Sequence, residues 1–430
     1  MQRSDFFGRK VMWAAFVMAV FGWGVGFYGP PVFLHAVIER TGWPLSLVSA
    51  AVTLHFLAGT LIVANLPRLH ARFGIARVIF GGSLMLAVGI GGWAIAEKPW
   101  QLMLAALCSG MGWVTLGAAA VNALIAPWFI TTRPAALGMV YNGASLGGVL
   151  FSPLWVASIA TLGFGGAVLT VGLLMVVVIG VLAWRVFVHS PESLGQYPDG
   201  GRVPAAAARS TALPLHLPGR ALWCNRQFIT LAMGVSLGLF AQIGLITHLF
   251  SLLVPRLGEQ WAGIAMSIAT LAAVGGRILV GRYLKPGIDR RKVACCAYAV
   301  QVLGSLVLLA SGGQPALLWL GVVLFGSGIG NATSLPPLIA QLEFADVQRA
   351  VALIVAISQA CYAFGPALFG LLRDASGGVA LLTAAAVIQG LAILSLALGR
   401  CAENNARSTT PAITAASPPD RPADASDRRP

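Results

Sequence analysis

The sequence predicts an all-α membrane protein whose twelve transmembrane helices form two six-helix halves. Three observations predict this fold: the apolar composition, the long apolar runs that recur along the chain, and a residue pattern that appears once in each half. Of 430 residues, 57% are hydrophobic and 10% are charged, whereas roughly a quarter are charged in soluble domains. Because such a chain cannot hide its apolar surface from water, we expect the lipid bilayer to be its solvent.

The apolar runs indicate helices rather than the strands of a β-barrel. Barrel strands alternate apolar and polar residues, whereas residues 167–188 are apolar on every face. A helix needs about 20 apolar residues to cross the hydrocarbon layer. The predicted helices cover residues 11–38, 45–66, 76–96, 100–126, 135–162 and 166–188, followed by 227–254, 261–284, 293–311, 316–340, 350–372 and 379–398.

Two polar segments divide the chain. Residues 1–188 are expected to form the N-terminal half and residues 227–399 the C-terminal half. Between them, residues 189–226 are rich in proline and alanine and are predicted to be a cytoplasmic linker. Residues 400–430 lack an apolar stripe and are expected to be a disordered cytoplasmic tail. The polar residues 1–10 lead directly into the first helix without a cleavage site, which predicts a retained helix rather than a signal peptide.

A repeated pattern supports the two-half arrangement. The sequence Ser-Gly-Met-Gly-Trp-Val-Thr at 109–115 reappears as Ser-Gly-Ile-Gly-Asn-Ala-Thr at 327–333, in the fourth predicted helix of each half. Matching residues follow downstream in each half, namely Arg133 with Arg349 and Pro153 with Pro366. Two related halves of this kind enclose a site near the bilayer midplane and expose it alternately to either side.

The basic residues predict the orientation of the chain. With the N-terminus in the cytoplasm, the cytoplasmic loops hold Arg68, Arg72, Arg77, Arg133, Arg282, Lys285, Arg290, Arg291, Lys292 and Arg349, and the opposite side holds Arg40, Lys98, Arg256 and Arg373. This asymmetry follows the positive-inside rule and predicts a bacterial inner (cytoplasmic) membrane protein with both termini in the cytoplasm. The net charge of +14 therefore reports topology, and we expect no nucleic-acid partner.

No pattern supports enzyme or metal chemistry. The sequence has no hydrolase motif and no glycine-rich phosphate loop, and its six cysteines lack metal-binding spacing. The adjacent residues Cys295 and Cys296 leave binding of a soft metal or metalloid open, although packing is the commoner role. We therefore expect no enzymatic activity, no cofactor and no metal.

Arg277 differs from the other basic residues because it falls inside a predicted helix, the eighth. Every acidic residue lies in a loop, in the tail or at a helix end, so no carboxylate is available near the bilayer centre. That absence counts against export of cations. Because a guanidinium keeps its charge, the carboxylate of a substrate is a credible partner for Arg277. The alternative is that the side chain snorkels to the cytoplasmic surface.

Other polar residues at membrane depth could serve a substrate or join helices. His55 and His248 are candidates for proton coupling, and His248 is favoured because it lies in the same half as Arg277. A neutral histidine bonded between helices is the alternative for both. The residues expected to contact the substrate are Arg277, Tyr28, Asn142, His248, Asn331 and Tyr362; further polar residues near span centres are Asn122, Tyr141, Gln242 and Gln359.

Glycine and proline are expected to shape two of the helices. The sequence Gly-Pro-Pro at 29–31 should break or kink the first helix, and helix ends beside such a break can offer backbone groups to a ligand. Gly143, Gly147 and Gly148 have the small-residue spacing that lets membrane helices approach closely.

With these residues in view, the sequence resembles the major facilitator superfamily over about residues 8–400. Within it, the sequence is similar to bacterial relatives of the monocarboxylate transporters and oxalate/formate exchangers. The residues that carry the resemblance are Gly42-Trp43-Pro44-Leu45-Ser46, Arg133 with Ala136-Leu137-Gly138, His248-Leu249, and Gly276-Arg277 with Gly281.

The resemblance implies that Arg277 grips a substrate carboxylate, because it occupies the place of the family's arginine in helix eight. Three departures accompany it. Eukaryotic monocarboxylate carriers have an aspartate where this chain has Ala273 and a lysine near Pro31, and oxalate exchangers have a second cation in helix eleven. The loop at 65–74 is a degenerate Gly-x-x-x-Asp-Arg-x-Gly motif in which Ala71 replaces the acid. One cation suits a monoanion better than a dianion.

We therefore expect a secondary transporter that moves a small organic anion, with a monocarboxylate favoured, by alternating access and with proton coupling left open. An exporter of drugs or metalloids is the alternative. A membrane enzyme would need a reactive constellation and a sensor would need an added domain, and neither is visible in the sequence.

Overall fold

The computed structural model describes residues 6–201, 220–284, 288–344 and 346–399. Within these ranges the chain is helical almost throughout and contains no strand. Ten described segments are long and apolar enough to span a membrane. Two of them, Arg133–Phe187 and Arg349–Leu398, turn at a glycine with positive φ, Gly163 (φ 70°) and Gly377 (φ 78°). Counting each of these two segments twice gives twelve spans and confirms the predicted fold.

The helices follow the predicted order. The N-terminal half consists of α1 (Gly8–Gly26), α2 (Gly29–Thr41), α3 (Leu45–Phe73), α4 (Ile75–Ile95), α5 (Pro99–Val114), α6 (Ala118–Ile125) and α7 (Arg133–Leu182), with a π-helical turn at Ala183–Phe187. The C-terminal half consists of α9 (Arg226–Leu257), α10 (Glu259–Tyr283), α11 (Arg290–Ala310), α12 (Pro315–Ile329), α13 (Asn331–Glu343), α14 (Val347–Tyr362) and α15 (Gly365–Leu398).

Between the halves lie two short 3-10 turns, Glu192–Leu194 and Pro198–Gly200, and the single turn α8 (Arg220–Trp223). The middle of the predicted linker, residues 202–219, and the predicted disordered tail, residues 400–430, lie outside the described residues. The predicted division into two halves joined by a linker thus stays a prediction in its central part.

The break predicted in the first span occurs where the sequence suggested, breaks in the two fourth spans were not predicted, and some helix ends differ from their predicted positions. The first span is interrupted at Phe27 and Tyr28, just before the predicted Gly-Pro-Pro sequence. Both copies of the repeated pattern coincide with a break in the fourth span of their half, after Val114 and after Ile329. By contrast, α3 continues through Pro67 to Phe73, past its predicted end at residue 66. Apolar composition marks the part of a helix inside the membrane, and a helix can continue beyond it.

α1 packs closely on α7 at Gly143 and Gly147, two of the glycines that were predicted to let helices approach. A Cβ atom added to Gly147 would lie 2.5 Å from the carbonyl oxygen of Val20, and one added to Gly143 would meet the backbone of Phe16. A larger residue at either position would push the two helices apart, as expected for small residues between membrane helices.

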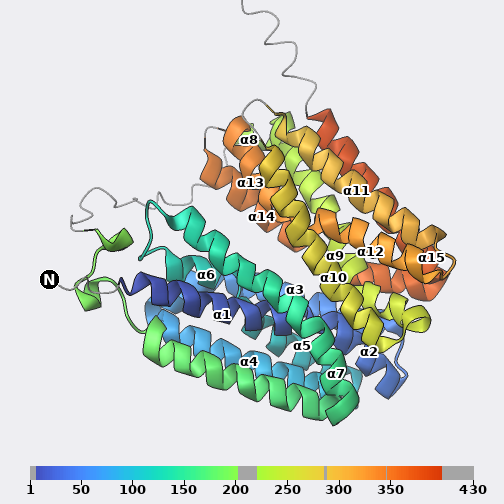
Figure 1. Ribbon diagram of the computed structural model, residues 1–430, viewed down its shortest axis with the longest axis horizontal. Helices are drawn as coiled ribbons and strands as arrows, with labels where there is room; N and C mark the ends of the chain where they lie inside the picture. Colours follow the sequence, from blue (N-terminus) through green and yellow to red (C-terminus); the bar gives the residue numbers. More distant parts are fainter. Residues whose placement is uncertain (1–5, 202–219, 285–287, 345, 400–430) are drawn as a thin grey trace, which may run out of the picture.

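The two halves meet at one end of the molecule. In Figure 1 the helices α1–α7 and α9–α15 form two bundles that converge near α2 and α15 and diverge toward α6 and α13. Within the described residues, hydrogen bonds join the halves from Ser46 N to Asp374 Oδ2 (2.7 Å), from Ala367 N to Thr53 Oγ1 (3.0 Å) and from Ser267 Oγ to Val149 O (2.7 Å). We call this the closed end and the opposite one the linker end.

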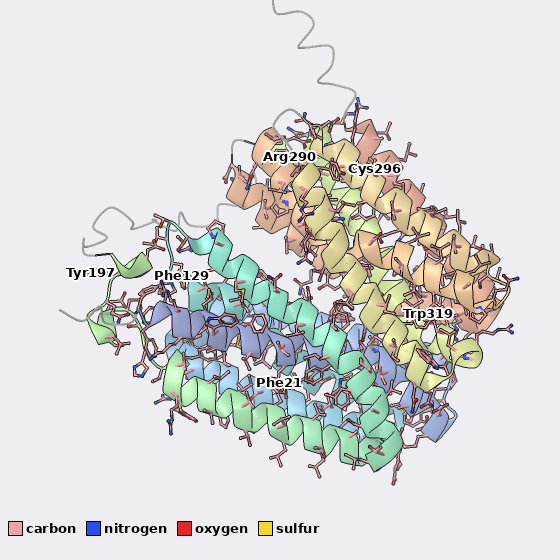
Figure 2. The ribbon with its side chains drawn as sticks, in the orientation of Figure 1. Phe21, Phe129, Tyr197, Arg290, Cys296 and Trp319 are labelled. Carbon is pink, nitrogen blue, oxygen red and sulfur yellow. The ribbon has the colours of Figure 1, made fainter. Side chains whose placement is uncertain are left out.

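Side chains at the two ends are visible in Figure 2. Phe129 of the N-terminal half, Tyr197 of the predicted linker and Arg290 of the C-terminal half mark the linker end, and Trp319 lies toward the closed end. The main packing pairs that join the halves are α7 with α10, α3 with α15 and α2 with α9, with a smaller contact of α3 with α14. The contacts between the halves therefore gather toward the closed end, and the two bundles diverge from it toward the linker end (Figure 1).

A buried ion pair holds the linker end of the C-terminal half together. Arg291 near the start of α11 is 3% exposed, and its Nε and Nη2 donate to Glu343 Oε1 (2.5 Å) and Oε2 (2.7 Å) at the end of α13. Its Nη1 also donates to Thr230 Oγ1 (3.0 Å) and Leu396 O (3.2 Å), and its Nη2 to Gln227 O (2.8 Å). One guanidinium thus connects α9, α11, α13 and α15. From the charge asymmetry of the sequence, Arg291 was predicted only to be a basic residue in a cytoplasmic loop.

Candidate functional site

Arg277 lies on α10 where the C-terminal half faces its partner. Its side chain is partly buried, and its Nε donates to Gly330 O at 3.3 Å, at the junction of α12 and α13. Within the described residues no acidic side chain forms an ion pair with it. A guanidinium offers five N–H donors, so most of them are left for water or a ligand.

The break in the first span brings Tyr28 to the same place. Tyr28 lies between α1 and α2 and is close enough to Arg277 to interact with it electrostatically. Gly148 of α7 provides the space: a Cβ atom there would lie 2.5 Å from Tyr28 Cζ and 2.9 Å from Thr270 Cγ2. Tyr28 from the N-terminal half and Thr270 and Arg277 from the C-terminal half therefore form one cluster, which we call the central cluster.

Helical spacing places Asn142 opposite this cluster. Val149 of α7 accepts a hydrogen bond from Ser267 of α10, so this face of α7 is turned to the C-terminal half. Asn142 precedes Val149 by seven residues, which is about two turns, and so lies on the same face nearer the linker end. Arg277 follows Thr270 by the same interval on α10. By this spacing, the exposed Asn142 and the partly buried Arg277 lie on the facing sides of α7 and α10.

Aromatic side chains border the central cluster. Phe27 contacts Tyr28 with ring centroids 5.1 Å apart, and Phe56 contacts Phe27 at 6.0 Å. The Phe56 ring also meets Tyr362, at the end of α14, edge-on with centroids 6.1 Å apart. Trp113 contacts the same Phe56 ring with centroids 5.5 Å apart. These rings form an apolar wall to which both halves contribute. Sequence reasoning named Tyr28 and Tyr362 but missed the others; the position of Trp113 inside the repeated pattern was the available signal.

The two histidines differ in their surroundings. His55 is fully bonded, with Nδ1 2.8 Å from Ser109 Oγ and Nε2 2.9 Å from Gly26 O, and its ring stacks on Trp113. His55 therefore links α3, α5 and α1 through hydrogen bonds, which is the arrangement expected of a histidine that joins helices. His248 places Nε2 3.0 Å from Pro366 O, and its buried Nδ1 has no hydrogen-bond partner among the described residues.

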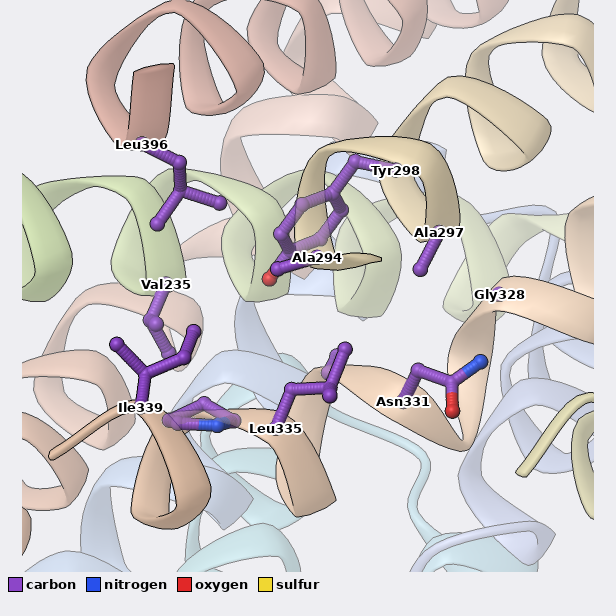
Figure 3. Close-up of a pocket in the computed structure, with 11 residues that line it drawn as sticks. Val235, Ala294, Ala297, Tyr298, Gly328, Asn331, Leu335, Ile339 and Leu396 are labelled. Atoms are coloured by element: carbon purple, nitrogen blue, oxygen red, sulfur yellow. The ribbon is translucent and has the colours of Figure 1, made fainter. Parts of the chain in front are cut away.

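Asn331 lies in a separate pocket. Figure 3 shows its side chain beside Gly328 and Ala297, with Tyr298 across the pocket. The lining residues all belong to the C-terminal half, and Asn331 Nδ2 donates to Ser327 O at 3.4 Å. Asn331 Oδ1 and the Tyr298 hydroxyl have no hydrogen-bond partner in the described part of the chain. Asn331 directly follows Gly330, which accepts the hydrogen bond from Arg277, while its own side chain lines this pocket within the C-terminal half.

Two six-helix bundles with polar side chains at their junction are the architecture of a secondary transporter. The chain belongs to the Major Facilitator Superfamily, whose sequence profile matches residues 12–368. The superfamily resemblance is thereby confirmed, and the protein is a multi-pass membrane transporter rather than an enzyme.

Two relatives illustrate the range of the family. The chain is 27% identical over 415 residues to the 2-nitroimidazole transporter of Escherichia coli (strain K12), covering 92% of this chain and 95% of that protein. It is 26% identical over 346 residues to the human Monocarboxylate transporter 11, covering 76% of this chain and 68% of that protein. Identities this low do not fix the substrate.

Solved structures share the fold. The nucleoside transporter NupG superposes with a TM-score of 0.68 at 13% identity, covering 92% of this chain and 98% of that one. A bacterial homologue of the human lysosomal transporter Spinster gives a TM-score of 0.61 at 14% identity, covering 92% and 95%. These likenesses concern the arrangement of the helices alone.

Proposed function

We propose that the protein carries a small organic anion, with a monocarboxylate favoured, across the bacterial cytoplasmic membrane. The observation that supports this proposal most is Arg277, a partly buried guanidinium with no acidic partner among the described residues. A charge at membrane depth is costly unless it is paired or hydrated. A carboxylate that enters from the linker end would pair with Arg277 through two parallel hydrogen bonds.

The remaining groups fit a small amphipathic anion. Tyr28 and Asn142 would supply hydrogen bonds beside the guanidinium, and the wall containing Phe56 and Tyr362 would cover an apolar substituent. Under the predicted topology the linker end faces the cytoplasm, so the described conformation is inward-facing. Alternating access then requires the closed end to open while the linker end closes.

Uptake by reconstituted vesicles tests the proposal. Purified protein in proteoliposomes is assayed with labelled monocarboxylates that differ in chain length, against empty liposomes. We expect saturable uptake of at least one monocarboxylate, inhibited by other monocarboxylates more strongly than by dicarboxylates. Uptake indistinguishable from empty liposomes for every acid would overturn the proposal.

Export of drugs is the second candidate function, and two relatives favour it. They are the 2-nitroimidazole transporter and the Fujikurins efflux protein of Gibberella fujikuroi, the latter 25% identical over 265 residues. The aromatic wall would suit a planar ring. Cells that express the protein and survive 2-nitroimidazole better than cells without it would show a drug-transport role, whereas carboxylate uptake without such resistance would exclude it.

Proton coupling is expected to depend on His248 more than on His55. His248 keeps a free ring nitrogen among the described residues and lies near the charges of Arg373 and Asp374, whereas both nitrogens of His55 are engaged. The measurement is vesicle uptake with and without an imposed pH gradient. His248→Gln should reduce the acceleration by the gradient, and His55→Gln should retain it. If the gradient accelerates both variants equally, coupling resides elsewhere.

The chain is expected to place its closed end in the periplasm and its linker end in the cytoplasm. Cysteines introduced one at a time at the exposed positions Glu97 and Gln260, in a chain otherwise free of cysteine, should react with an impermeant thiol reagent from the periplasmic side. A cysteine at Lys292, which is exposed at the linker end, should react only after the membrane is opened. Reaction of position 97 solely from the cytoplasmic side would contradict the predicted topology.

A further inference from the structure

Three potential metal ligands meet at the closed end. His35 and Glu39 lie one turn apart on α2, and Glu259 is the first residue of α10. His35 Nε2 is 3.2 Å from Glu39 Oε1 and 3.9 Å from Glu259 Oε1. One ligand atom from each residue lies within 4.8 Å of the other two. We call these residues the outer triad.

The imidazole of His35 faces two carboxylates at ion-pair distance without an aligned hydrogen bond to any part of the chain that the structure describes, an arrangement that a bound cation would also satisfy. His35 Nε2 is buried and faces two carboxylates, yet it has no hydrogen-bond partner in the described residues. A neutral imidazole with its lone pair on this nitrogen would meet only other acceptors. A divalent cation between the three groups would satisfy all of them. The nearby Phe250 ring, 5.3 Å from the imidazole centroid, limits how far His35 can turn away.

The distances suit Zn²⁺. Zinc binds histidine nitrogen and carboxylate oxygen at about 2.0–2.2 Å in tetrahedral geometry, which separates neighbouring ligand atoms by about 3.4 Å. The pair His35 and Glu39 already has about this separation, at 3.2 Å, whereas Glu259, 3.9 Å from His35, must move toward both of the other ligands, the three atoms lying within 4.8 Å of one another. Both carboxylates are partly exposed, at 57% and 42%, so a metal and its remaining water ligand can reach them.

The outer triad crosses between the halves, since α2 belongs to one and α10 to the other. We propose that His35, Glu39 and Glu259 bind a divalent transition-metal ion of the Zn²⁺ type that clamps the closed end. Opening this end separates Glu259 from the other two ligands. The ion therefore binds the closed-end state more tightly and shifts the population toward it.

Zinc binding to the full chain in detergent is the first test. The purified protein is freed of metal with a chelator and titrated with Zn²⁺ alone, with binding followed by competition with a chromophoric chelator and by the melting temperature. We expect one site and a rise in melting temperature in the unaltered chain. Glu259→Gln and Glu39→Gln should each weaken binding at least about tenfold and abolish the rise.

Two matched variants serve as controls for this experiment. Glu97→Gln removes an exposed carboxylate outside the triad, and a variant with both Cys295→Ser and Cys296→Ser removes the adjacent thiols; both should bind Zn²⁺ like the unaltered chain. Equal affinity in the unaltered chain and in Glu259→Gln, or loss of the site only in the cysteine variant, would overturn the proposal.

The clamp itself is tested by accessibility at the linker end. In a chain otherwise free of cysteine, a cysteine at Asn142 reports opening of the linker end to a maleimide reagent. Zn²⁺ should increase its rate of labelling, because the clamp holds the conformation in which Asn142 is exposed. The same cysteine combined with Glu259→Gln corrects for direct contact of zinc with the thiol. An equal response in both chains would mean that the metal does not clamp the closed end.

Discussion

Replacing Arg277 with glutamine is expected to lower carboxylate binding and uptake by orders of magnitude while leaving the protein folded. The physical reason is that a carboxylate in a site with little water would lose a charged, two-point partner. Losses of this kind amount to several kcal/mol, and each 1.4 kcal/mol is a factor of about ten in affinity. The measurement is uptake by proteoliposomes that contain equal amounts of each variant.

Arg277→Lys distinguishes the two interpretations of this residue. A lysine ammonium cannot reproduce the planar two-point contact, so a carboxylate clamp predicts that this variant also loses most of its transport. A snorkelling arginine predicts that lysine works nearly as well. Arg282→Gln is the matched control, because Arg282 is exposed one turn further along α10. Normal uptake in a well-expressed Arg277→Gln variant would eliminate the clamp and leave the fold untouched.

Arg291→Ala is expected to destabilise the C-terminal half severely. The substitution removes a guanidinium that is 3% exposed and leaves the Glu343 carboxylate, 10% exposed, without its partner. Breaking a buried pair by removing one charge costs about 3–5 kcal/mol. A marked fall in melting temperature in detergent, with loss of monodisperse protein, is the expected result.

Two variants test whether this loss arises from the unpaired charge. Lys292→Ala removes an exposed charge from the adjacent position and should leave the melting temperature nearly unchanged. The double variant Arg291→Met with Glu343→Leu should recover much of the loss, because an apolar pair of similar volume carries no buried charge. An Arg291→Ala chain as stable as Lys292→Ala would show that the pair contributes little.

The fold could be predicted because its signals are local. Apolar length locates each span, and the Gly-Pro-Pro sequence after Tyr28 locates the break in the first one. The end of α3 could not be placed in this way, because its last turns are polar and lie beyond the predicted membrane segment. Arg291 was assigned to a loop for a related reason: its partner Glu343 lies in a different helix, and only folding brings the two together.

The candidate site was predictable only in part. Arg277 could be singled out because an intramembrane charge is conspicuous in any sequence, and the structure brings Tyr28 to it. Asn331 shows the limit, because a polar residue near a span centre can face either the partner half or its own bundle. The outer triad was invisible, since Glu259 lies far from His35 in sequence and no short spacing links them. The expectation of no metal rested on such spacings alone.

The central claim, that the transporter binds a carboxylate through Arg277, is tested most directly by comparing two ligands of nearly the same shape. Binding of a monocarboxylate and of its neutral amide is measured by calorimetry on the purified chain and on Arg277→Gln. We predict that the unaltered chain prefers the carboxylate at least about tenfold and that the preference disappears in the variant. Equal affinity for acid and amide in the unaltered chain would contradict the claim.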